Sequence, residues 1–134
     1  MKLILSSCDF RNEKSQKVIV DNLPYPIDKC RLLFIPNEKA TEEAISGDVY
    51  YDRMQEFGFA KENVYVFDHN NPDKFKNLDI DIVYISGGNT FGTLDKITKC
   101  VYNISIVLLA TLPRRKDPCS SKTGKKKYLP YRIY

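Results

Sequence analysis

The chain has 134 residues, of which 43% are hydrophobic and 28% are charged, which is enough for one domain with a hydrophobic core. Its apolar stretches fall far short of the roughly 20 residues that span a membrane, and its charge is too low for a highly charged disordered protein. The net charge of +4 is unevenly spread: residues 1–109 hold 13 Lys or Arg against 16 Asp or Glu, whereas residues 110–134 hold eight against one. We therefore expect a cytoplasmic protein without membrane contact, with an acidic body and a basic end.

Strand and helix signals alternate along the body. Short apolar runs predict strands, and apolar residues at helical spacing between them predict helices. Asn12 and Thr41 are good helix caps, and Gly58 is a good helix end. The expected strands are 2–6, 31–35, 63–67 and 80–85, and residues 104–109 can form one more. The expected helices are 12–23, 41–58, 73–78 and one from 90 through 97.

This alternation predicts the fold class. Strands joined by helices at this spacing form right-handed βαβ units and a mostly parallel sheet. Short, uniformly apolar strands suit a sheet that is covered on both faces. We expect residues 1–109 to form an α/β domain, with a mostly parallel open sheet and helices on both faces.

The regular pattern ends after Lys99. Residues 110–134 have no hydrophobic period, and we expect them to form a basic, disordered tail. The chain has a single histidine and no C-x-x-C pair, so we expect no zinc site. We expect free, mostly buried thiols in a reducing compartment. The four cysteines are Cys8, Cys30, Cys100 and Cys119.

The strongest local signal is the segment Val83-Tyr84-Ile85-Ser86-Gly87-Gly88-Asn89-Thr90-Phe91. Paired glycines after a strand allow a tight turn and let backbone N–H groups point at a ligand. In an open parallel sheet such a turn lies at the carboxyl ends of the strands, where ligands bind. An ordinary strand-to-helix turn that needs two glycines for packing explains the segment equally well, so the residues alone leave both interpretations open.

Three segments in this order resemble one family. Tyr84 to Phe91, followed by Leu94, is similar to a G-G-N-T-F-x-L-L motif, although Thr93 precedes Leu94. Residues 2–7, followed by a helix, fit the same pattern. Leu33-Phe34-Ile35-Pro36 is similar to the start of an L-F-I-P-T-A motif, with Asn37-Glu38 in place of Thr-Ala. Over about residues 1–99 the chain resembles the peptidase E family of serine peptidases, within the class I glutamine amidotransferase-like group.

The resemblance implies a flavodoxin-like fold and a serine hydrolase that removes an N-terminal aspartate from small peptides, without a cofactor. In the family, the glycine before the Asn donates a backbone N–H to the oxyanion hole, and Gly88 holds that position here. Gly87 and Asn89 are the adjacent residues expected to bind substrate. Such a donor is typically worth roughly 3 kcal/mol of the reaction barrier.

The catalytic serine of the family has no counterpart. The family continues to a G-x-S-A-G nucleophile elbow and then to a histidine. No G-x-S-x-G occurs here, and the serines after the glycine segment are Ser105, Ser120 and Ser121. We identify no catalytic residue, and we expect a truncated, inactive member of the lineage. A shifted reading frame, or an equivalent truncation, would explain the lost pattern and the reversed charge.

Four further residues are weaker candidates for chemistry. His69 lies in an Asn-rich turn, and we expect it to be a surface residue because no nucleophile is visible for it to serve. Cys100 has Lys96 nearby, which can lower a thiol pKa, but it does not lie in an elbow. Asp79 and Asp81 lie two residues apart at the start of the predicted strand 80–85, so their side chains would face the same side. Paired carboxylates can do acid–base work, but we expect a solvated strand end.

The basic end suggests an alternative function. Residues 119–126 have P-loop spacing but lack its first glycine and its last Ser or Thr, so they are not a P-loop. Basic residues interleaved with Tyr128, Tyr131 and Tyr134 can bind RNA or single-stranded DNA. The alternative is a non-catalytic module whose tail binds polyanions, although we favour a small peptide over nucleic acid as partner. An exposed sheet edge would also favour homo-oligomers.

Overall fold

The computed structural model describes residues 1–6, 9–87, 89–98, 101–102, 104–110 and 132–133. The strands are β1 (Lys2–Ser6), β2 (Leu32–Ile35), β3 (Val64–Val66), β4 (Leu78–Asp79), β5 (Ile82–Ile85), β6 (Val101–Tyr102), β7 (Ile106–Ala110) and β8 (Arg132–Ile133). The α-helices are α1 (Glu13–Asp21), α2 (Glu42–Ser46), α3 (Val49–Glu56) and α4 (Thr90–Thr98). The 3-10 helices are η1 (Asp9–Arg11), η2 (Ile27–Lys29), η3 (Lys61–Asn63) and η4 (Pro72–Phe75).

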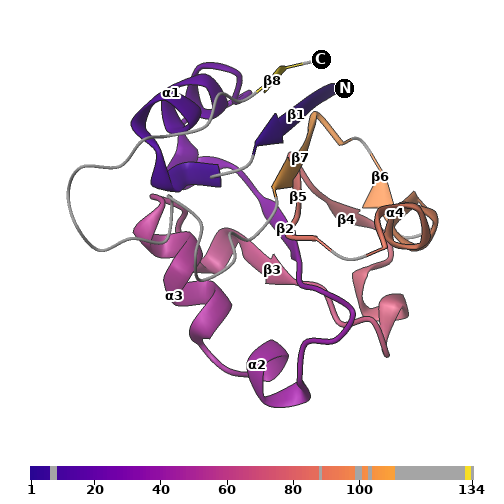
Figure 1. The fold of residues 1–134 in the computed structure, drawn as a ribbon. Helices are drawn as coiled ribbons and strands as arrows, with labels where there is room; N and C mark the ends of the chain where they lie inside the picture. Colours follow the sequence, from indigo (N-terminus) through magenta and orange to yellow (C-terminus); the bar gives the residue numbers. More distant parts are fainter. Residues whose placement is uncertain (7–8, 88, 99–100, 103, 111–131, 134) are drawn as a thin grey trace.

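The main sheet has six strands in the order β3-β2-β5-β7-β1-β8, and β4 pairs with β6 in a separate two-stranded sheet (Figure 1). The first five strands of the main sheet are parallel, and β8 is antiparallel to β1. The prediction of an α/β fold with a mostly parallel sheet is therefore confirmed. Within the described residues, no helix combines the length and the apolar character needed to cross a bilayer.

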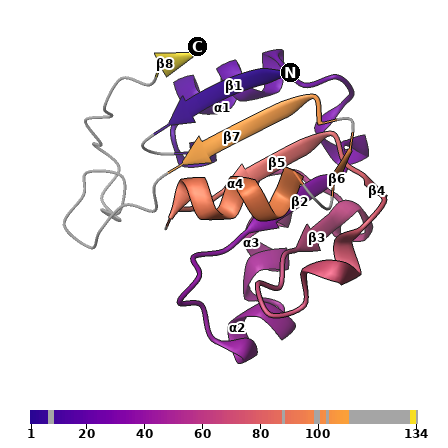
Figure 2. The same cartoon turned by 90° about the vertical axis from the view of Figure 1, so that its right-hand side faces the viewer.

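Helices cover both faces of the sheet, as expected. Side chains alternate along each strand, so Leu32 and Phe34 pack on one face while Leu33 and Ile35 pack on the other. The first face is covered by α1 and α3, and the second by α4 and η4. Figure 2 shows α4 in front of the sheet, with α1 behind it. All four residues of β2 are fully buried, which explains their uniformly apolar sequence.

The strand order differs from the flavodoxin-like one. A flavodoxin-like sheet has the order 2-1-3-4-5, with the first two strands adjacent. Here β5 and β7 lie between β1 and β2. Neighbouring strands are about 4.8 Å apart, so the connection through η1, α1 and η2 is long enough to pass over two strands. The structure therefore confirms the α/β class and the mostly parallel sheet, whereas the finer flavodoxin-like expectation is not confirmed by the strand order counted from β1.

The structure divides one of the expected helices into two. Residues 41–58 were expected to form a single helix, but α2 ends at Ser46 and α3 begins at Val49. Gly47 is extended at the end of α2, with a ψ of −173°, and its N–H donates to the Glu43 carbonyl at 2.9 Å. A Cβ on Gly47 would lie 2.7 Å from that carbonyl oxygen, so the close turn requires glycine. Thr41 caps α2 as expected, because its side chain accepts from the Ala44 N–H.

Two other segments refine the expectations. Residues 73–78 do not form a regular helix: η4 ends at Phe75 and β4 begins at Leu78, because Pro72 favours a tight first turn and Asn77 adopts a φ of 62°. In the basic end, Arg132–Ile133 pair with Leu5 and Ile4 of β1. Residues 111–131 and 134 lie outside the described residues, as does the expectation of disorder for them.

Candidate functional site

The sheet reverses its direction of winding between β2 and β5. The chain leaves β2 for β3 on one side, whereas it leaves β5 for β7 on the other. In open α/β sheets, ligands bind outside the carboxyl ends of the strands at such a switch point. The segments at this point are the residues after Ile35, at the end of β2, and the turn that begins at Ser86, after β5. The predicted glycine turn therefore lies where ligands bind in this architecture.

Ser86 fixes the start of the turn. Its backbone N–H and its hydroxyl both donate to the Ile35 carbonyl, at 3.1 and 2.9 Å. The residue is buried, so this hydroxyl is a structural donor that ties the end of β5 to the end of β2. Two hydrogen bonds to one carbonyl hold the turn rigidly relative to the neighbouring strand.

Gly87 makes the turn possible. Its φ is +129°, a left-handed conformation that residues with a Cβ rarely adopt. A Cβ built on Gly87 would meet no atom of the described residues within 4 Å. Among these residues, glycine is required here by the backbone conformation and not by crowding. Gly88, the expected oxyanion donor, lies outside the described residues.

Asn89 caps α4. Its side-chain Oδ1 accepts from the Gly92 N–H at 3.2 Å, and its carbonyl accepts from the Thr93 N–H at 2.9 Å. Asn89 is exposed, so its side chain lies at the surface beside the turn. The structure thus gives Asn89 the capping role that Asn commonly has at a helix start. Its expected role in substrate binding stays a prediction.

His69 is more than a surface residue. It is half-buried, its Nε2 lies 2.9 Å from the Pro36 carbonyl oxygen, and its ring meets the Phe67 ring edge-on at 5.2 Å. His69 is thus partly exposed, as a surface residue is, but its contact with Pro36 spans 33 residues of sequence and could not be read from the local turn. His69 joins the end of β3 to the end of β2, on the opposite side of β2 from Ser86.

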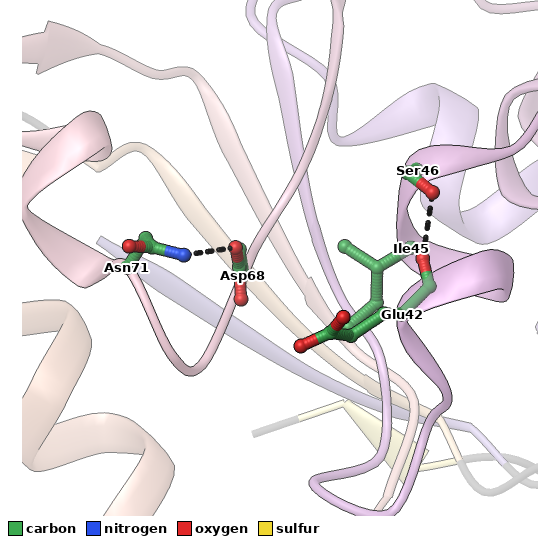
Figure 3. A pocket seen from close by; sticks show the side chains of 5 residues that line it. All are labelled: Glu42, Ile45, Ser46, Asp68 and Asn71. Carbon is green, nitrogen blue, oxygen red and sulfur yellow. Dashed lines mark hydrogen bonds between the residues drawn. The ribbon is translucent and has the colours of Figure 1, made fainter.

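A shallow hollow of about 250 Å³ lies beside the end of β3 (Figure 3). It is lined by Glu42, Ile45, Ser46, Asp68 and Asn71. The hydrogen bond from the Asn71 side chain, and then the one from the Asn70 N–H, lower the pKa of Asp68. Asp68 therefore stays ionised, and the hollow presents two carboxylates. From the sequence, only a turn and a helix cap were predicted in this region, because the two walls of the hollow come from separate segments.

Asp79 and Asp81 lie at the opposite end of the sheet from the turn. Arg31 holds both: Nη1 donates to Asp79 at 2.6 Å, and Nη2 donates to Asp81 at 3.0 Å. Asp81 is buried, so the expectation of a solvated strand end is wrong for this residue, because the guanidinium replaces water. Burial raises the pKa of Asp81, but hydrogen bonds from the Arg31 side chain and backbone outweigh it and lower the pKa overall.

The remaining candidates contribute no group to the turn in the part of the chain that is described. Ser105 lies at the amino end of β7, where its N–H donates to the Asp81 carbonyl. Cys30 is a buried free thiol whose Sγ donates to the Tyr25 carbonyl at 3.3 Å, and burial raises its pKa. Cys8, Cys100, Cys119, Ser120 and Ser121 lie outside the described residues.

Among the described residues, no three His, Cys, Asp or Glu side chains gather closely enough to hold a metal ion. The chemistry that this edge of the sheet offers is therefore hydrogen bonding from a glycine turn, together with a hollow lined by carboxylates. No protein-family model, no curated protein and no solved structure matches this chain.

Proposed function

We propose that this chain is the front half of a peptidase E-like domain of the class I glutamine amidotransferase-like group, and that its carboxyl edge binds short peptides without cleaving them. The observation that carries the proposal is the Ser86–Gly87 turn. It lies at the switch point of a parallel sheet, it is held by two hydrogen bonds to Ile35, and no side chain of the described residues fills the space where a Gly87 Cβ would lie. These features suit backbone N–H donors for a peptide carbonyl or carboxylate.

Hydrolysis needs a nucleophile with a base in hydrogen-bond reach. The sequence has no G-x-S-x-G elbow. At the described part of the carboxyl edge, the Ser86 hydroxyl is occupied by the Ile35 carbonyl, and the His69 Nε2 is occupied by the Pro36 carbonyl. These contacts support a binding function in a lineage whose activity has been lost.

The first test is an assay of Asp-X dipeptides with the full chain at high protein concentration. We expect no turnover. Protein-dependent cleavage that persists after Ser105, Ser120 and Ser121 are each changed to Ala would show that a nucleophile has been overlooked.

Binding is tested separately by calorimetric titration with the same dipeptides. We expect heat of binding with the natural chain and none with Gly87→Ala, because alanine strains the turn. Gly58→Ala is the matched control, since Gly58 also has a positive φ, of 110°. It lies just after α3, and a Cβ there would meet the side chain of Ile27 in η2. Equal loss in both variants, or no binding by the natural chain, would contradict the proposal.

The competing proposal is a module that binds polyanions. Residues 111–131 carry seven Lys or Arg and one Asp. Ala110 pairs with Ser6, and Arg132 pairs with Leu5, so the chain leaves β7 and re-enters β8 at the carboxyl edge. A labelled single-stranded RNA tests this proposal. Affinity that falls steeply with salt, and that is lost when residues 114–134 are deleted, would favour it over peptide binding.

We also propose self-association through the edge of the sheet. Within the described residues β3 pairs only with β2, so its outer edge has no strand beside it. An open strand edge is a template for pairing with a second copy. Sedimentation velocity over a wide concentration range should then reveal a dimer. A monomer at every concentration would contradict this.

A cytoplasmic location completes the proposal. The free thiol of Cys30, buried against the Tyr25 carbonyl, supports it, because buried unpaired cysteines are usual in reducing compartments. Fractionation of cells that express a tagged chain should recover it with cytosolic markers. Recovery in an exported fraction would contradict the location.

A further inference from the structure

His69 is the only histidine of the chain, and it links two strand ends. Its Nε2 lies 2.9 Å from the Pro36 carbonyl oxygen. Because a carbonyl can only accept, Nε2 must carry the proton of the neutral ring, which leaves Nδ1 as the unprotonated nitrogen. The Phe67 ring, at 89° to the imidazole, holds it in this orientation.

The Nδ1 atom is buried, and it has no hydrogen-bond partner among the residues that the structure describes. In the neutral ring this atom presents only a lone pair. Protonation would turn it into a charged N–H donor in a place where no described acceptor meets it. A buried donor without a partner costs free energy, and a charged one costs more.

Two uncharged residues contact the ring: Pro36 after β2, through its carbonyl, and Phe67 after β3, through its ring. The charged residues on the neighbouring segments are Glu38 and Lys39 after β2, Glu42 and Glu43 in α2, Asp68 in the same turn, and Asp73, Lys74 and Lys76 in and after η4. Both oxygens of Asp68 accept hydrogen bonds within its own turn. None of these groups is bonded to Nδ1.

We propose that His69 is a pH-sensitive latch on the carboxyl edge. The neutral ring ties the turn after β3 to the end of β2, and protonation of Nδ1 releases this tie. The end of β2 also receives both hydrogen bonds from Ser86, so the latch and the candidate binding turn share one strand end. The latch is inferred from the ring contacts alone and holds whether or not the turn binds a peptide.

Acid favours release because the two states differ in proton binding. A conformation in which Nδ1 meets water takes up a proton more readily than the latched one, so lowering the pH shifts the population towards release.

The experiment is hydrogen exchange of the full chain, without ligand, at about pH 7.5 and about pH 5.5, for the natural chain and for His69→Gln. The Gln amide keeps an N–H that can donate to the Pro36 carbonyl, but it does not titrate. After correction for the intrinsic exchange rate, the exchange rate of residues 34–41 and 66–72 in the natural chain should be higher at the lower pH. The increase is at most tenfold per pH unit, because one proton is taken up. Residues 13–21 should respond alike in both proteins.

Nitrogen NMR of the single imidazole provides the second measurement, on the natural chain alone. We expect the Nε2–H tautomer at neutral pH. An Nδ1–H tautomer, no pH response, or the same response in His69→Gln would overturn the latch. Neither readout involves a ligand, so failure of the latch is distinguishable from failure of peptide binding.

Discussion

Arg31 and Asp81 meet through three hydrogen bonds at the amino end of the sheet. The Arg31 backbone N–H and its Nε both donate to Asp81 Oδ2, at 2.9 and 3.1 Å, and Nη2 donates to Oδ1 at 3.0 Å. The backbone of Asp81 extends the link, because its carbonyl accepts from the N–H groups of Ser105 and Ile106. One residue thus joins the starts of β2, β5 and β7.

Removal of the Asp81 charge should therefore weaken the whole sheet. Asp81→Asn leaves the part-buried Arg31 N–H with a poorer acceptor, and we expect a loss of about 2 kcal/mol in the free energy of unfolding. Urea unfolding measures it. Asp79→Asn is the matched control, because Asp79 binds the same guanidinium but is 63% exposed, and it should change little. Equal effects of the two substitutions would contradict the central role of Asp81.

The Asp81 carboxylate should also make the free energy of unfolding depend on pH. The pKa of Asp81 is lowered in the folded chain, so the folded state holds the carboxylate more strongly than the unfolded state does. Its contribution is complete above the ordinary aspartate pKa of 3.8 and is lost as the pH falls through the lower folded value. Urea midpoints between about pH 6 and pH 3 should fall more steeply for the natural chain than for Asp81→Asn. Parallel curves would exclude this linkage.

Gly47 should resist substitution. A methyl group at this position would lie 2.7 Å from the Glu43 carbonyl oxygen, so Gly47→Ala must displace the backbone between α2 and α3, at a cost of about 1–3 kcal/mol. Gly92→Ala is the comparison, because its methyl group would meet the movable side chain of Asn89 at 3.2 Å. Thermal unfolding should separate the two variants. A neutral Gly47→Ala would mean that this break between the helices is not sterically required.

Asn12 should be a sensitive helix cap. It is 1% exposed, and its Oδ1 accepts from the Lys14 and Ser15 N–H groups at 2.9 and 3.4 Å. Asn12→Ala should cost about 1 kcal/mol of unfolding free energy, and Asn12→Ser, which keeps an acceptor, should recover much of it. Chemical unfolding of the three proteins provides the measurement. If serine were no better than alanine, packing would outweigh capping at this site.

The sequence predicted the elements of this fold better than their arrangement. β2 and β5 are four-residue apolar runs buried on both faces, so composition alone identifies them. The pairing of β1 with β7 depends on contacts between residues about 100 positions apart, which no local pattern encodes. The break at Gly47 was missed because its cause is the distance from one carbonyl oxygen to an absent methyl group.

The candidate site, too, was predicted only in part from the sequence. The glycine turn was predictable, because a strand followed by glycines at a carboxyl edge has a local signature. The contact of His69 with Pro36 and the hollow between Glu42 and Asp68 were not, since each joins segments that are separate in sequence. These two features can be predicted only once β2 and β3 are known to be neighbouring strands.

The pairing of β8 with β1 also determines how the chain would respond to force applied through its ends. Because β8 is antiparallel to β1, both ends of the chain leave at the amino edge, and tension would open the pairs Leu5–Arg132 and Ile4–Ile133 one after the other. The load would then pass to β1 and β7, which are parallel. There, five residue pairs from Lys2–Ile106 to Ser6–Ala110 would be sheared together. Single-molecule stretching should therefore record a weak first event followed by a much stronger one.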